Sequence, residues 1–147
     1  MGLQERQAAQ DFQNNDLPAL QNELNTLVGS EVEIEADWDS LTEDGLAAHL
    51  PSHWTNLYFK PLFGVLSEIG STDLGKQALQ DSFKKLSIKN TLETGNKKDA
   101  VSFADNTLTI DHKPATNVPD CDSSDGNGDM SCREMRDVLR DVLNANL

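Results

Sequence analysis

Apolar residues change their spacing several times along the chain, and each change predicts a new element. Residues 3–13 follow a helical pattern with few apolar positions, which predicts a short polar helix. A second helix is predicted to start at Pro18, with Asn15 or Asp16 as its cap, and to end at Gly29. Its apolar side recurs at helical spacing through Leu17, Leu20, Leu24, Leu27 and Val28.

The segment 31–39 has a period of two, which is typical of a half-buried strand. Helical spacing returns in the segment 57–69, where Pro61 is expected to begin or kink the helix. Ser71, Thr72 and Asp73 offer a cap for a further helix. Leu74, Ala78, Leu79 and Phe83 continue its apolar side.

Three short strands are predicted next, over residues 86–88, 101–103 and 108–110. The last two flank Asp105 and Asn106, a turn pair, and so predict a hairpin. The order of elements indicates a single α+β domain over residues 1–147, with helices on one face of a small, mostly antiparallel sheet. Large aromatic residues such as Trp38 and Trp54 are expected to fill its core.

The C-terminal helix is predicted to pack through an apolar stripe of Met135, Val138, Leu139, Val142 and Leu143. Directly before it, oxygen-bearing residues recur at the spacing of a twelve-residue calcium loop, with glycine at the sixth position and an apolar residue at the eighth. The residues 123–134 therefore resemble an EF-hand calcium-binding loop, and 123–147 resemble that loop with its exit helix.

The resemblance implies a Ca²⁺ site and assigns a ligand role to each oxygen position. These positions are Ser123, Asp125, Asn127, Asp129, Ser131 and Glu134. Asp129 would bind through its backbone carbonyl, and Glu134 through both carboxylate oxygens. Gly128 would adopt positive φ, and Met130 would tether the loop to the core.

Two features of the loop differ from the EF-hand pattern. The first position carries Ser123 in place of aspartate, which removes a charged ligand. Pro114 and Pro119 precede the loop, so an ordinary entering helix cannot form. Weak Ca²⁺ binding follows from both differences. The alternative, a plain solvated acidic turn, stays open because glycine-rich acidic loops also occur without metal.

The formal net charge of −13 disfavours nucleic acids and anionic membranes as partners, because both would be repelled. The same charge permits cationic partners, such as metal ions or a basic protein surface. Five carboxylates lie on one face of the predicted strand, roughly 6.6 Å apart, two residue rises. They are Glu31, Glu33, Glu35, Asp37 and Asp39. An interaction protein, such as an immunity-type inhibitor, could present this acidic face to a basic partner. The alternative is a solvated strand face neutralised by Lys85 and Lys89.

No nucleophile motif, phosphate loop or dinucleotide fingerprint is found, which favours a non-catalytic protein. No basic-then-apolar signal region is apparent either, which favours a cytoplasmic location. In that location Cys121 and Cys132 are expected to be free thiols. The sequence thus predicts an acidic binding protein, with Ca²⁺ as the first candidate ligand and a basic protein as the alternative.

Overall fold

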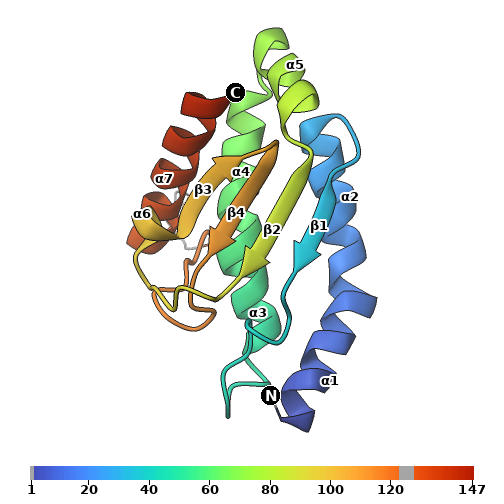
Figure 1. Ribbon diagram of the computed structural model, residues 1–147, viewed down its shortest axis with the longest axis vertical. Helices are drawn as coiled ribbons and strands as arrows, with labels where there is room; N and C mark the ends of the chain where they lie inside the picture. Colours follow the sequence, from blue (N-terminus) through green and yellow to red (C-terminus); the bar gives the residue numbers. More distant parts are fainter. Residues whose placement is uncertain (1, 123–127) are drawn as a thin grey trace.

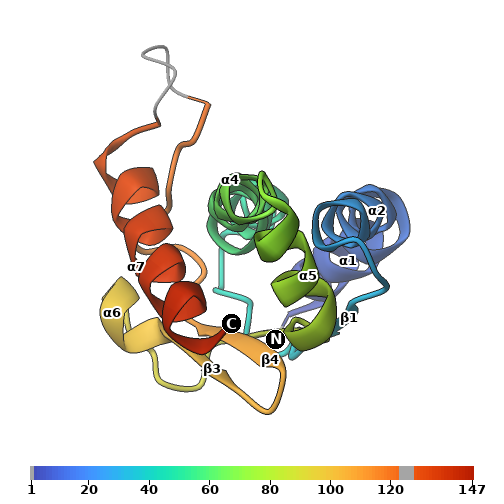
Figure 2. The same ribbon diagram turned by 90° about the horizontal axis from the view of Figure 1, so that it is seen from above.

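The computed structural model describes residues 2–122 and 128–147 and has helices packed on one face of a four-stranded sheet (Figures 1 and 2). The strand order is β1-β2-β4-β3. The strands are β1 (Glu33–Ala36), β2 (Lys85–Lys89), β3 (Val101–Ala104) and β4 (Thr107–Asp111). The helices are α1 (Leu3–Asp11), α2 (Leu17–Val28), α3 (Leu50–Trp54), α4 (Lys60–Ile69), α5 (Asp73–Ser82), α6 (Lys97–Ala100) and α7 (Met130–Asn146).

The predicted α+β class is confirmed, but the sheet is mixed rather than mostly antiparallel. The neighbours β1 and β2 run parallel, as do β2 and β4, and only β3 and β4 are antiparallel. The helices between β1 and β2 form a crossover connection, and such a connection allows parallel pairing. The predicted hairpin is confirmed at β3 and β4. Asp105 and Asn106 have φ of 53° and 60°, as a two-residue type I′ turn requires.

Two prolines, Pro18 and Pro61, lie within continuous helical stretches and do not interrupt them. A π-helical turn, η1 (Phe12–Asp16), joins α1 to α2, and a second, η2 (Thr55–Phe59), joins α3 to α4. Each ends two residues before a proline, Pro18 or Pro61. Proline has no backbone N–H to donate, and its ring crowds the preceding helical turn. A wider π-helical turn relieves that clash, so the helix can continue past the proline.

This arrangement corrects the predicted caps and helix boundaries around both prolines. Asn15 and Asp16 lie within η1, and Asp16 makes no side-chain cap bond to α2. The second helical stretch begins at Leu50, well before the predicted segment. Pro61 does lie in the first turn of α4, as expected of a proline that begins a helix. Other boundaries agree with the sequence. Gly29 ends α2 with φ of 83°, and the hydroxyl of Thr72 accepts a hydrogen bond from the N–H of Gly75 at the start of α5.

The core lies between the sheet and α2, α4 and α7 (Figure 2). Alternate strand residues such as Leu86, Ile88, Leu108 and Ile110 are fully buried against the helices. The opposite face of the sheet carries polar residues, including Lys85, Ser87 and Thr109, and no helix covers it in Figure 2. Trp38 lies beyond the end of β1 and packs edge-on against Trp54, with ring centroids 5.1 Å apart. The predicted strand 31–39 is therefore shortened to 33–36.

Candidate functional site

The acidic row predicted from the sequence lies along and beside β1. Glu33 and Glu35 belong to the strand, and their side chains share the open face of the sheet with Lys85 of β2. Glu31 precedes the strand, and Asp37 and Asp39 follow it. All five residues are exposed. The structure thus keeps all five carboxylates exposed, but only two of them lie in regular strand.

Lys85 partly neutralises this row, as one of the two readings of the sequence expects. Its Nζ lies 4.0 Å from the Oε2 of Glu33 and forms a closer ion pair with Glu35. The hydrogen bond and charge of Lys85 lower the pKa of Glu35, and the bond to Glu35 raises the pKa of Lys85. Solvent screens these exposed charges, so the pairs contribute little to stability.

Strand β1 is also an edge of the sheet, because within residues 2–122 and 128–147 it pairs with β2 alone (Figure 1). The N–H groups of Glu33 and Asp37 donate to carbonyls of Lys84 and Ile88. In a parallel ladder alternate residues face the partner, so the backbone groups of Ile34 and Ala36 point toward the free side. A cleft of about 540 Å³ adjoins this edge, between α2 and the start of β1. Exposed edge strands of this kind pair readily with another chain.

Of the six predicted calcium ligands, Ser123, Asp125 and Asn127 lie outside the described residues. The other three have hydrogen bonds or neighbours within the protein. The Oδ1 of Asp129 caps α7 by accepting from the N–H of Cys132 at 2.8 Å, and it also accepts from Asp120 at 3.1 Å. The hydroxyl of Ser131 donates to the carbonyl of Asn117 at 2.6 Å.

Glu134 is exposed on α7, on the side where Lys97 lies. Among the described residues, no group of three or more His, Cys, Asp or Glu residues is placed to hold a metal ion. The expected backbone conformation of Gly128 is confirmed, with φ of 79°. Met130, however, is 67% exposed, so it does not tether the loop to the core. Helix α7 begins at Met130, and the chain turns this side chain outward at the first helical position.

The expected free thiols are also corrected, because Cys121 and Cys132 form a disulfide. Cys132 is fully buried in the first turn of α7, and the bond holds residue 121 against that turn. The sequence signal was the placement of the two cysteines on either side of the loop. The assumption of a reducing environment, rather than the spacing, led to the wrong expectation.

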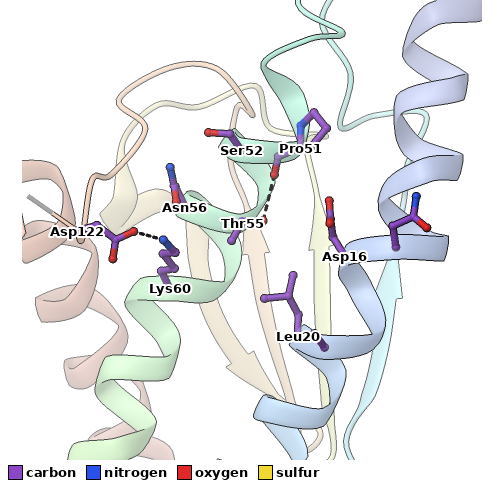
Figure 3. Close-up of a pocket in the computed structure, with 10 residues that line it drawn as sticks. Asp16, Leu20, Pro51, Ser52, Thr55, Asn56, Lys60 and Asp122 are labelled. Atoms are coloured by element: carbon purple, nitrogen blue, oxygen red, sulfur yellow. Dashed lines mark hydrogen bonds and ion pairs between the residues drawn. The ribbon is translucent and has the colours of Figure 1, made fainter.

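A polar cleft that the sequence did not indicate lies between the two π-helical turns (Figure 3). It has a volume of about 590 Å³, and its lining includes Asp16 of η1 and Thr55 and Asn56 of η2. An ion pair between Lys60 and Asp122 lies at one side of it (Figure 3). Two prolines within apolar helical patterns were the only sequence signal, since π-helical turns often occur at functional sites.

Comparisons with protein-family models, with curated proteins and with solved structures found no match to this chain. Within residues 2–122 and 128–147, no helix is long and apolar enough to cross a membrane.

Proposed function

We propose that this protein is a non-catalytic binding protein that presents the free edge of β1, with its row of carboxylates, to a basic protein. The observation that carries the proposal is the coincidence of two features in one strand. The backbone of Ile34 and Ala36 faces an unpaired edge, and exposed carboxylates flank it at Glu33, Glu35 and Asp37. Backbone pairing supplies affinity in such strand additions, and side chains supply specificity.

The chemistry of the edge suits an extended segment rich in lysine or arginine. Its backbone would pair with Ile34 and Ala36, and its cationic side chains would replace Lys85 beside Glu33 and Glu35. The exposed pairs of Lys85 are weak, so this exchange costs little. A basic nuclease held by an immunity-type inhibitor is one partner of this kind, since the carboxylate spacing approximates that of phosphates along a single strand. Charge complementarity would mainly speed association.

Two variants test the edge and the charges separately. Ala36→Pro removes one outward N–H without removing a bond to β2, and Ala36→Val is its matched control. Glu33→Gln with Glu35→Gln removes two charges from the row. Asp11→Asn with Glu23→Gln removes the same charge from the exposed surfaces of α1 and α2.

The readout is association with a lysine-rich, strand-forming peptide, measured by surface plasmon resonance at several salt concentrations. We expect Ala36→Pro to weaken binding, and the β1 double variant to slow association and flatten its salt dependence. The α1 and α2 double variant should keep most of the parent behaviour. If both double variants behave alike, net charge alone explains the association and the docking edge is ruled out.

A second proposal is weak Ca²⁺ binding by the 123–134 loop. Two observations favour it: Gly128 has the positive φ that such a loop needs, and the disulfide joins residue 121, just before the loop, to residue 132 within it. That link takes the place of the missing entering helix as an anchor. Affinity of about 10⁻⁴ M or poorer is expected, because an anionic ligand is missing.

Calorimetry tests the calcium proposal. Ser123→Asp should tighten binding by adding a charged ligand, and Glu134→Gln should abolish it. Asp105→Asn in the distant β3–β4 hairpin removes one charge and should change nothing. Millimolar Ca²⁺ that gives neither heat nor a shift in the melting midpoint would rule this function out.

A cytoplasmic location remains a prediction from the sequence alone. The disulfide favours an oxidising compartment instead, because disulfides rarely persist in the cytosol. Mass spectrometry of alkylated protein from fractionated cells distinguishes the two locations. Free thiols on protein in the cytosolic fraction would support the cytoplasmic prediction, and bridged cysteines on protein outside that fraction would support the oxidising compartment.

A further inference from the structure

A cleft of about 730 Å³ lies between α6 and α7, away from β1. One wall is formed by the segment 95–98 and the other by α7. The volume lies within the usual range for small-molecule sites, about 300–1,000 Å³. Neither proposed function uses this cleft as a binding site, although Glu134 lies on its rim.

The first wall contains a buried cation with unused hydrogen-bonding capacity. Lys97 is only 5% exposed, and its Nζ donates to the carbonyl of Asn117 at 3.0 Å. An ammonium can donate three hydrogen bonds, and Lys97 makes no other within the described chain. Burial lowers its pKa, and the charges of Glu134 and Asp129 oppose that shift. A buried ammonium with two donors unused within the described residues favours a further acceptor, such as a bound ligand.

Asn117 fixes the position of this ammonium. Its backbone has φ of 51°, and its side-chain amide donates to the carbonyl of Gly95 at 3.0 Å. Its own carbonyl accepts from both Lys97 and Ser131. The start of α6 and the start of α7 are therefore joined through one residue. A non-glycine residue with positive φ is a feature often found at functional sites.

The opposite wall is acidic. Glu134, Asp137 and Asp141 follow one face of α7 and line the cleft. Asp137 already accepts from Arg140 at 2.8 Å. Glu134 and Asp141 have no ion pair within the described residues. Val138 contributes an apolar surface between them.

A ligand that satisfies both walls must carry an anionic and a cationic group. A simple anion would be repelled by α7, and a simple cation by Lys97 and Lys98. We propose that this cleft binds a free α-amino acid, with its carboxylate at the Lys97 ammonium, its ammonium at Asp141 and its side chain against Val138.

Three related probes test the proposal on the intact protein. They are free leucine, 4-methylpentanoate, which lacks the amino group, and 3-methylbutylamine, which lacks the carboxylate. Binding is followed by backbone amide shifts in NMR spectra during titration. Free leucine should move the amides of Gly95, Asn96 and Val138. It should bind roughly tenfold more tightly than either single-charge probe, since each charged hydrogen bond is worth about that factor.

Variants then assign each wall. Lys97→Met should weaken the binding of free leucine at least about tenfold, whereas Lys76→Met, at an exposed position on α5 outside the cleft, should change it little. Asp141→Asn should remove most of the preference for leucine over 4-methylpentanoate. If Lys97→Met does not fold, the comparison of the three probes on the parent protein still decides. Equal affinity for all three, shifts confined to other regions, or no shifts at tens of millimolar would each overturn the proposal.

Discussion

Arg140 of α7 donates two hydrogen bonds to Glu68 of α4, from Nε to Oε2 at 2.8 Å and from Nη2 to Oε1 at 3.0 Å. This two-bonded geometry is the strongest form of an Arg–carboxylate pair. It joins the last helix to the central one on the outer surface. The pair also lowers the pKa of Glu68 below its ordinary value of 4.5, chiefly through the hydrogen bond from Arg140.

Acid should therefore remove the stability that this pair contributes. The pKa of Glu68 is depressed in the folded protein, so its contribution is present above pH 4.5 and is lost as the pH falls through the folded pKa. The side chains of Arg140 and Glu68 are 33% and 52% exposed, so we expect the pair to contribute less than about 1 kcal/mol to the free energy of unfolding. Urea unfolding at neutral and acid pH, with Glu68→Gln beside the parent, measures it. Equal acid sensitivity of the two proteins would contradict this expectation.

Tyr58 should not ionise while the protein is folded. It is the only tyrosine, it is fully buried, and its hydroxyl donates to the carbonyl of His112 at 2.7 Å. Burial and then the charge of Asp111 raise its pKa far above the ordinary value of 10.0. The contribution of the protonated phenol to stability is thus complete below pH 10 and is lost above it.

Absorbance at 295 nm against pH follows this single group directly. The transition should coincide with alkaline unfolding seen by circular dichroism, and it should fall near pH 10 in denaturant. Tyr58→Phe should cost about 1–3 kcal/mol, because the carbonyl of His112 loses its buried partner. A separate tyrosine transition near pH 10 in folded protein would show that the phenol is accessible.

Leu139 anchors α7 in the core. Met135, Leu139 and Leu143 are fully buried, as the apolar stripe predicted, whereas Val138 and Val142 are half-buried. Leu139→Ala should lower the free energy of unfolding by about 2–5 kcal/mol. Val142→Ala, on the same helix, should cost clearly less. Denaturant unfolding compares the two, and an unchanged midpoint for Leu139→Ala would mean that α7 does not stabilise the isolated chain.

Reduction of the disulfide should destabilise the protein. Cys121 and Cys132 are separated by 11 positions, and closing a loop of that size restricts the unfolded chain by about 3 kcal/mol in the entropic treatment. The melting midpoint should fall when a reductant is added. Cys121→Ser with Cys132→Ala should melt at the lower temperature and should not respond to reductant. A parent protein that is insensitive to verified reduction would show that the link adds nothing to stability.

Local patterns in the sequence were sufficient to predict several elements. Gly29 after a helical pattern predicted the end of α2, and the pair Asp105 and Asn106 predicted the hairpin turn. Both features depend on residues that are adjacent in the chain. Parallel pairing of β1 with β2 could not be predicted this way. It depends on how the intervening helices pack, which no period within the strands records.

In the candidate sites, too, features set by local sequence could be predicted and features set by tertiary packing could not. The exposure of Glu33 and Glu35, and the contact with Lys85, could be predicted from alternation and from neighbouring strands. The cleft beside Lys97 could not, because α6, the turn at Asn117 and α7 are distant in sequence and meet only in the folded chain. Met130 was placed inward by analogy with EF-hand loops. An earlier start of α7 places it outward instead.

The order of strands has a consequence for folding. Between β1 and β2 the chain passes through α3, η2, α4 and α5, whereas β3 and β4 are separated only by Asp105 and Asn106. Closing the short hairpin costs little entropy, and closing the long connection costs more before any contact repays it. We therefore expect β3 and β4 to pair early and β1 to join the sheet last. The edge proposed to receive a partner would then be the final strand that the protein itself has to place.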